Sequence, residues 1–139
     1  MVVSREVAAA RLRRLEESIR RLRRIAQSPR DAYLADDDAK ALAERHFQIA
    51  AQCLLDLANH IVAEEGLGDP EDAESILDCL LRGGVIDPDL HGRVKGLGGF
   101  RNVLVHDYLG VDHVRVHGLL QRLDDLLDLA RALESRAAR

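Results

Sequence analysis

The sequence predicts an all-α fold, in which one domain over residues 1–139 forms a bundle of four to five largely antiparallel helices. Along most of the chain apolar residues recur three or four positions apart, which places them on one face of a helix. No segment alternates apolar and polar residues as a half-buried strand does, and no repeat or low-complexity segment occurs. Short connections rich in Gly, Pro and Asp separate the helical segments, so neighbouring helices fold back and pack on one another.

The first helix is expected from Ser4 to Ala26, before a break at Gln27-Ser28-Pro29. Its apolar stripe consists of Leu12, Leu15, Ile19, Leu22 and Ala26. Residues 1–30 hold nine Arg and three Glu, whereas residues 31–139 hold eleven basic and twenty-one acidic residues. Two interpretations of this cationic helix stay open. It either meets phosphates or an acidic partner, since guanidinium forks match phosphate, or it is a solvated face paired with acidic neighbours.

The second long helix is expected from Ala39 to about Glu65, at the centre of the bundle. Residues 30–35 form a short connection or a single helical turn before it, and the three Asp residues at 36–38 cap its start. Its apolar stripe is wide enough to be buried on more than one side. Gly66 and Gly68 end it.

Two Asp-Pro pairs mark the next helix starts, because a capping Asp with Pro at the first helical position is a strong start signal. Asp69-Pro70 opens a third helix that ends at Gly83-Gly84, and Asp87-Pro88 opens a fourth. Glycines at positions 96, 98 and 99 interrupt the fourth helix and indicate a bend or a close approach to another helix. Asp112 caps the last helix, which runs to about Ser135.

Composition limits the range of functions. The chain has a net charge of −4 and no apolar run near the ~20 residues that span a membrane. Its first residues lack the pattern of a signal peptide, so a cytoplasmic location is expected. Cys53 and Cys79 are too few and too far apart for a disulfide framework or a zinc motif, and both are expected to be reduced thiols of the core. The negative charge disfavours broad affinity for nucleic acid and favours a locally cationic cleft.

Four polar residues between positions 101 and 108 carry the chemistry. Arg101, Asn102, His106 and Tyr108 stand among aliphatic residues, and at ~100° per residue they fall on one half of a helix. Arg101 and His106 lie ~140° apart, whereas Asn102 and His106 stack at i, i+4, so the amide can orient the ring. An imidazole that transfers protons and a guanidinium beside phosphorane oxygens suit metal-free RNA cleavage. The alternative is a satisfied buried histidine and a salt-bridged arginine.

Residues 101–108, Arg-Asn-Val-Leu-Val-His-Asp-Tyr, resemble the R-x4-H-x-Y motif of the HepT family. This family comprises ribonuclease toxins of the HEPN fold that are paired with nucleotidyltransferase antitoxins of the MntA type. Further similar stretches are Gly99-Phe100 before the motif, residues 49–60 on the second long helix, and Gly84-Val85-Ile86. The resemblance spans nearly the whole chain and implies a HEPN-like helical domain.

The resemblance also implies a homodimer, in which the motif helices of two chains face a common cleft and form a composite site. It implies metal-independent RNA cleavage that leaves a 2′,3′-cyclic phosphate, without a cofactor. Arg101 and His106 match the catalytic pair, and Asn102 matches the supporting polar residue. Tyr108 matches the tyrosine that the partner antitoxin modifies with AMP. A bulky anionic group there would block the cleft and repel RNA phosphates, so modification is expected to switch the enzyme off.

Other polar residues give weaker indications. His113 and His117 are i, i+4 on the last helix and could bind a metal, but the sequence places no third ligand, so a solvated helix face is preferred. Asp56 and His60 are expected to satisfy each other or a neighbouring chain, or to line the cleft. Two more histidines are expected at the surface, His46 and His91.

Two other functions stay open from the sequence. A HEPN scaffold could bind a nucleotidyltransferase or a nucleotide without catalysis, with Arg101 and His106 gripping phosphate. In that case AMP on Tyr108 would change the affinity for the partner but would not change a rate of RNA cleavage. Alternatively, the polar residues form an interface network that specifies dimer pairing, and Arg101→Ala would then dissociate the dimer.

Overall fold

The computed structural model describes residues 5–137, so the expected first helical residue, Ser4, lies outside it. That range folds into eight α-helices and one short 3-10 helix, with no strand, which confirms the all-α prediction. In chain order the elements are α1 (Arg5–Ala26), α2 (Arg30–Leu34), α3 (Asp37–Glu65), α4 (Ala73–Arg82), α5 (Pro88–Val94), α6 (Leu97–His106), η1 (Tyr108–Gly110), α7 (His113–Leu120) and α8 (Leu123–Ala137).

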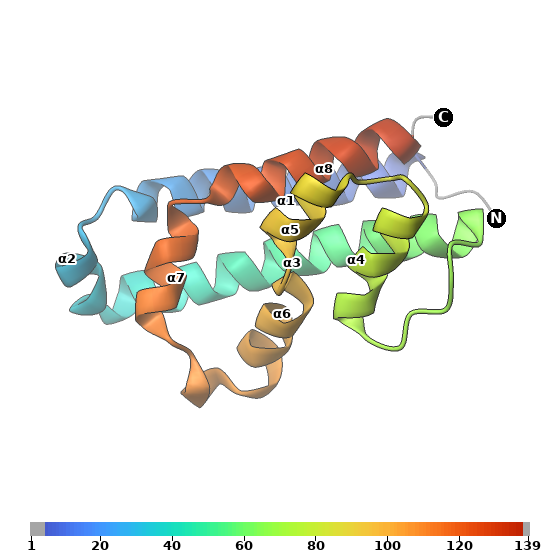
Figure 1. The fold of residues 1–139 in the computed structure, drawn as a ribbon. Coiled ribbons are helices and arrows are strands. Elements are labelled where there is room, and N and C mark those ends of the chain that lie inside the picture. The colour runs from blue at the N-terminus through green and yellow to red at the C-terminus, as the bar shows by residue number, and fades with distance from the viewer. Residues whose placement is uncertain (1–4, 138–139) are drawn as a thin grey trace.

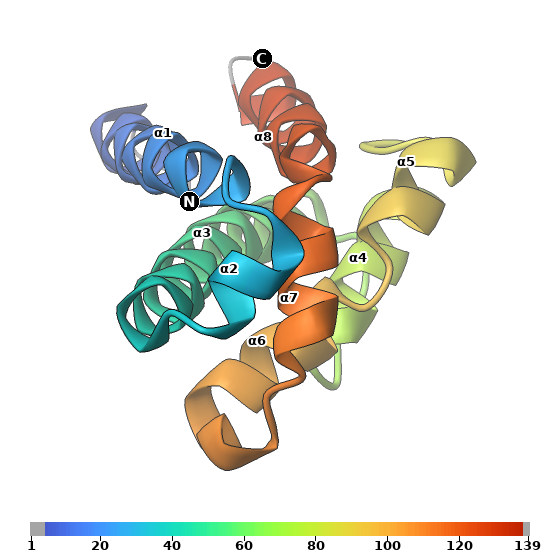
Figure 2. The same cartoon turned by 90° about the vertical axis from the view of Figure 1, so that its left-hand side faces the viewer.

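Helix α3 is the centre of the bundle, as its wide apolar stripe predicts. It contacts α1, α2, α4, α6, α7 and α8. In Figure 1, α1 and α8 run above α3 and α6 lies below it. Figure 2 gives the same order after a quarter turn, with α3 between α1 and α6. The helix that carries the motif therefore lies across the bundle from the arginine-rich helix.

Capping residues set most helix starts where the sequence predicts them. The side chain of Asp36 accepts the Ala39 N–H at the start of α3, and that of Asp87 accepts the Leu90 N–H at the start of α5. Asp112 accepts two backbone N–H groups at the start of α7. Each cap supplies a partner to a backbone donor that the first turn leaves without one.

The expected start of the third helix is wrong. Helix α4 begins at Ala73, three residues after the predicted Asp69-Pro70 start. Asp72 is the cap, because its carboxylate accepts the Ser75 N–H at 2.8 Å while Ser75 Oγ accepts the Asp72 N–H at 3.0 Å. This reciprocal capping box satisfies two backbone donors, so it outweighs the Asp-Pro pair as a start signal.

Both of the last two expected helices are divided. The fourth breaks into α5 and α6 at Gly96, whose φ of 93° is a left-handed conformation that favours glycine. This break is the predicted bend. The last helix breaks into α7 and α8 at Gln121 and Arg122, where backbone N–H groups bond to carbonyls three residues earlier. No Gly or Pro marks that second break, since it arises from a tighter turn rather than from a residue with special φ.

The core is aliphatic, and one predicted surface residue belongs to it. Fully buried side chains include Leu22, Leu54 and Leu129. His46, expected at the surface, is buried, and its Nδ1 lies 3.2 Å from Ser18 Oγ on α1. The stripe of α3 is wide enough to include it, because α1 covers that side. The pKa of His46 is lowered by burial and then by the charges of nearby arginines.

The cysteines follow the prediction of reduced thiols. Neither Cys53 nor Cys79 forms a disulfide, and Cys79 is buried while Cys53 is half-buried. Burial raises the pKa of the Cys53 thiol, with a further contribution from the charge of Asp56. None of the helices between residues 5 and 137 is both long and apolar enough to cross a membrane.

The arginines of α1 divide into two groups. Arg11, Arg14, Arg21 and Arg23 pair with carboxylates, the shortest contact being 2.7 Å from Arg23 Nη2 to Asp124 Oδ1. The others make no ion pair with any residue between 5 and 137, namely Arg5, Arg13, Arg20 and Arg24. Acidic neighbours therefore account for half of the positive charge on the helix.

Candidate active site

Helix α6 carries the first three residues of the motif, and contacts with α4 fix its start. The Glu74 carboxylate accepts the N–H of Gly96 at 2.7 Å and that of Gly98 at 2.9 Å. A Cβ on Gly98 would overlap the backbone of α4, at 2.7 Å from Ala73 C and 2.8 Å from Glu74 Cα. Gly98 is therefore the predicted close approach between helices, and it lets the Glu74 carboxylate bind the free N–H groups of the first turn.

The apolar face of α6 packs on α3. Leu97 and Leu104 are buried. The ring of Phe100 meets Phe47 with centroids 5.5 Å apart and planes inclined at 74°, an edge-to-face arrangement that aromatic pairs favour. Arg101 lies ~60° from Leu104 around the helix. It therefore stands at the border between the buried and exposed faces.

Arg101 carries a charge that no described residue neutralises. Its Nε is buried without a hydrogen-bond partner, and its guanidinium makes no ion pair within residues 5–137. A cation that is partly removed from water without a partner is costly, so an incoming anion would gain from contact with it. The alternative of a salt-bridged arginine does not describe this side chain.

Asn102 and His106 point away from the core. Both are exposed, which excludes the alternative of a buried and satisfied histidine. They share the outer face of α6 with Gly99, around which no atom lies within 4 Å of an added Cβ. The structure gives no hydrogen bond between the Asn102 amide and the His106 ring, so the expected orientation of the ring by the amide stays a prediction.

Tyr108 does not lie on the motif helix. Helix α6 ends at His106, since Asp107 has a φ of −136° and a ψ of 53°, and Tyr108 begins the 3-10 helix η1. The expectation that Tyr108 shares a helical half with Arg101 is therefore wrong. Its side chain is 68% exposed and that of Leu109 is 89% exposed, so the phenol lies on a projecting loop that an enzyme could reach.

A family model decides what this chain is related to. The model described as Ribonuclease HepT-like matches residues 15–135, which include α6 and nearly all of the bundle. The chain belongs to the HepT-like ribonuclease family. The resemblance inferred from Arg101 to Tyr108 is thereby confirmed.

The proteins similar to this HepT-like chain include a nuclease and, among solved structures of the same fold, a toxin. The mRNA nuclease HepT of Shewanella oneidensis is 33% identical over 82 residues, which take in 58% of this chain and 61% of that protein. The tri-AMPylated HEPN toxin of the same organism, solved with its MNT antitoxin, superposes with a TM-score of 0.82 at 21% identity over 93% of this chain and 97% of the toxin. The cytosolic protein YutE of Bacillus subtilis, of unknown function, gives 0.79 at 22% identity over 96% and 90%.

The weaker candidates of this HepT-like chain lie on helices other than α6. Asp56 accepts a hydrogen bond from Gln52 at 2.8 Å and lies 3.8 Å from Arg11 Nε, so it faces α1 instead of lining a cleft with α6. The structure gives it no hydrogen bond to His60. His91, expected at the surface, is half-buried and lies 2.8 Å from Asp78 Oδ1.

The histidines of α7 contact protein groups. His117 Nε2 lies 3.0 Å from the Ser28 carbonyl and its ring packs 5.4 Å from that of Tyr33, so the expected solvated face is wrong for it. His113 Nδ1 lies 3.8 Å from Glu44 Oε1. Burial and then the Glu44 charge raise the pKa of Tyr33 to about 12. Within residues 5–137 no group of three or more His, Cys, Asp or Glu could hold a metal.

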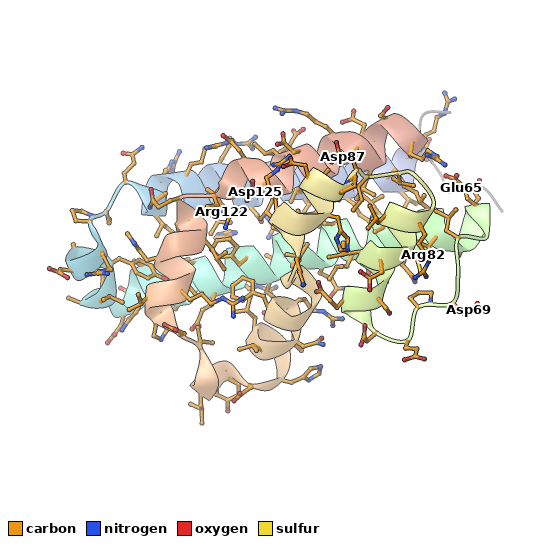
Figure 3. The ribbon with its side chains drawn as sticks, viewed as in Figure 1. Glu65, Asp69, Arg82, Asp87, Arg122 and Asp125 are labelled. Carbon is orange, nitrogen blue, oxygen red and sulfur yellow. The ribbon has the colours of Figure 1, made fainter. Side chains whose placement is uncertain are left out.

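The sequence does not predict a cavity of about 440 Å³ that lies beside Leu97 and Phe100 of α6. Its walls come from α3, α5, α6, α7 and α8, and they include the rings of Phe47 and Phe100. Four cationic residues also line it, Arg93, Lys95, Arg115 and Arg122. Figure 3 labels Arg122 and Asp125 at the junction of α7 and α8, on one wall of the cavity. These residues are scattered in sequence and only the fold gathers them.

Proposed function

We propose that this HepT-like protein is the cytosolic ribonuclease toxin of a toxin–antitoxin pair, and that Arg101 and His106 cleave RNA without a metal ion. The observation that carries the proposal is the unpaired guanidinium of Arg101, five residues from the exposed imidazole of His106 on one helix. The family match and the nuclease name of the Shewanella relative support it.

The two side chains supply what cleavage by the 2′-hydroxyl needs. His106 accepts the proton of the 2′-hydroxyl or donates one to the leaving 5′-oxygen, because an imidazole changes charge near neutral pH. Arg101 donates hydrogen bonds to the phosphorane oxygens as their negative charge grows. The 2′-oxygen bonds to phosphorus as the 5′-oxygen leaves, which yields a 2′,3′-cyclic phosphate. Asn102, beside Arg101, supports the binding of the strand.

The working site requires two chains. Arg101 and His106 lie ~140° apart on α6, so one helix directs them to different sides. The outer face between them is open, because Gly99 has no side chain and Asn102 is exposed. A second α6 packed on this face in a homodimer would bring Arg101 of one protomer toward His106 of its partner, and two-fold symmetry would place two Arg and two His in one cleft.

RNA cleavage by the purified protein in EDTA tests the enzyme. Arg101→Ala and His106→Ala should each lower the rate by about 10²–10⁴-fold, the usual contribution of one acid–base or electrostatic group. His60→Ala and Arg20→Ala are the matched controls, since both residues lie off α6, and they should retain activity. Cleavage that persists in the first two variants, or that requires a metal ion, would refute the proposal.

Mixed dimers test the composite site. Arg101→Ala and His106→Ala chains are combined after mild unfolding and refolding together. An equal mixture should regain at most about a quarter of the wild-type activity, because half of the dimers are mixed and each contains one intact Arg–His combination of two. A mixture as inactive as its components would mean that each chain forms its own site.

Tyr108 is the proposed control point, modified with AMP by a nucleotidyltransferase partner of the MntA type. Its phenol oxygen attacks the α-phosphate of ATP, and pyrophosphate leaves. The exposed position of Tyr108, two residues beyond His106, supports this role, as does the tri-AMPylated state named for the Shewanella toxin. Added phosphate charge beside Arg101 and His106 would repel RNA.

Labelling with radioactive ATP and the partner enzyme tests this switch. Wild-type protein should incorporate label and lose RNA cleavage, while Tyr108→Phe should do neither. Tyr33→Phe is the control for the other tyrosine, which is buried and should contribute no label. Incorporation without loss of cleavage would favour an effect on partner affinity alone.

A further inference from the structure

We propose that the cavity between α5, α6, α7 and α8 binds a small organic phosphate with a flat apolar body, the chemistry of a mononucleotide. Its volume of about 440 Å³ falls within the range of small-molecule sites, ~300–1,000 Å³. Neither Arg101 nor His106 lines it. The proposal is therefore independent of the ribonuclease site on the exposed face of α6.

Two of the four cations that line the cavity, Arg93 and Arg122, are already paired with carboxylates. Arg93 is committed, since it bonds Asp89, Asp125 and Asp128 at 2.8–3.0 Å, and these bonds raise its pKa. Asp125 also accepts from Arg122 at 3.1 Å. The Asp125 carboxylate on α8 therefore accepts hydrogen bonds from the guanidinium groups of both Arg93 and Arg122.

Lys95 and Arg115 also line the cavity, and neither has an ion-pair partner among residues 5–137. Arg115 Nη2 lies over the start of α6, 3.7 Å from where a Cβ on Gly96 would be. These two uncommitted cations are available to bind a phosphate, and charge-assisted hydrogen bonds to phosphate are among the strongest in proteins.

The inner surface of the cavity is apolar and aromatic. Phe47, Phe100 and Leu119 contribute to it, together with Leu97 and Leu126. Aliphatic and aromatic lining with a few convergent polar groups is the usual composition of a small-molecule site. A ring such as a nucleobase could lie against these side chains while its phosphate reaches Lys95 and Arg115.

Two glycines line the cavity beside open space. Gly92 on α5 and Gly118 on α7 both line it, and an added Cβ at either would meet no atom within 4 Å. Neither has the positive φ that requires glycine. Glycine inside a helix costs about 1 kcal/mol relative to alanine, so neither folding nor packing favours it here. The cavity is open beside both positions, which leaves room for a ligand.

Isothermal titration calorimetry on the full chain tests the site, with AMP, adenosine and inorganic phosphate as separate probes. AMP should bind, and adenosine and phosphate should each bind at least about tenfold more weakly, since each lacks one half of the contacts. Arg115→Gln removes one uncommitted cation and should weaken AMP by about tenfold or more. Arg20→Gln, an unpaired arginine on α1, is the matched control and should leave AMP binding unchanged.

Filling the cavity gives the second test. Gly118→Leu and Gly92→Leu each place a side chain in the open space from a different wall, and both should abolish AMP binding while circular dichroism stays that of the wild type. Using both variants keeps the test decisive if one fails to fold. Arg101→Ala should bind AMP like the wild type, which separates this cavity from the proposed catalytic site.

Three results would overturn the proposal. AMP fails to bind the wild type, or it still binds when Leu fills the cavity, or its binding is lost in Arg101→Ala. A fourth outcome points to a different occupant. If Gly118→Leu dissociates a dimer in analytical ultracentrifugation and AMP does not bind the wild type, the cavity receives a second copy of the chain and no small phosphate.

Discussion

Substituting Gly98 by alanine should destabilise the fold more than any other single-methyl addition on α6. The new Cβ meets backbone atoms of Ala73 and Glu74, which cannot rotate away as a side-chain tip can, so α6 must move off α4. Overpacking of this kind costs about 1–3 kcal/mol. The same movement weakens the two charge-assisted hydrogen bonds from Gly96 and Gly98 to Glu74, each contributing about 1.5–3 kcal/mol.

Alanine also offsets part of this cost, because it is favoured over glycine in a helix by about 1 kcal/mol. The net expectation is a loss of about 3 kcal/mol in the free energy of unfolding, or about 10 °C in Tm for a chain of this size. Urea denaturation followed by circular dichroism at a fixed protein concentration measures it. Gly118→Ala is the matched control and should gain up to about 1 kcal/mol. Equal stability of Gly98→Ala and wild type, or equal losses in both variants, would refute the reasoning.

Three further predictions concern stability. The lowered pKa of His46 favours its neutral form in the fold, so its contribution is present above pH ~6.5 and is lost as pH falls; His46→Gln should flatten the dependence of Tm on pH between 7 and 5, and an unchanged slope would contradict this. Arg136 makes a bidentate ion pair with Glu65 at 2.6–3.0 Å. Arg136→Ala should lower the free energy of unfolding in urea by about 1–2 kcal/mol, and an unchanged value would mean that the pair contributes no stability. Leu54→Ala, at a fully buried position of α3, should cost about 3 kcal/mol in the same assay, and a loss below about 1 kcal/mol would place Leu54 outside the core.

Periodicity and capping chemistry predict most of the fold. The wide apolar stripe of α3 predicted that it is the central helix. Asp36, Asp87 and Asp112 cap helices where the sequence predicts them. These features are local, since each depends on residues within one or two turns. The predicted start of α4 was wrong because Ser75, three residues after Asp72, completes a stronger cap than the Asp-Pro pair supplies.

Tertiary contacts explain what the sequence could not predict. The break between α7 and α8 has no Gly or Pro, and His46 is buried only because α1 covers its side of α3. The motif was identifiable because all its residues lie in one octet of sequence. The end of α6 before Tyr108 could not be predicted, since the helical pattern of the sequence continues past His106 while the backbone turns at Asp107.

The hydrogen bonds from the Gly96 and Gly98 N–H groups to the Glu74 carboxylate bear on how relatives of this protein should be compared. The motif residues of α6 depend for their direction on a carboxylate in a different helix, outside the motif and early in α4. A chain can keep every letter from Arg101 to Tyr108 and still present its guanidinium and imidazole wrongly, if the acid at the start of α4 is lost. Surveys that sort such proteins into active and inactive toxins should therefore score this upstream acid together with the motif.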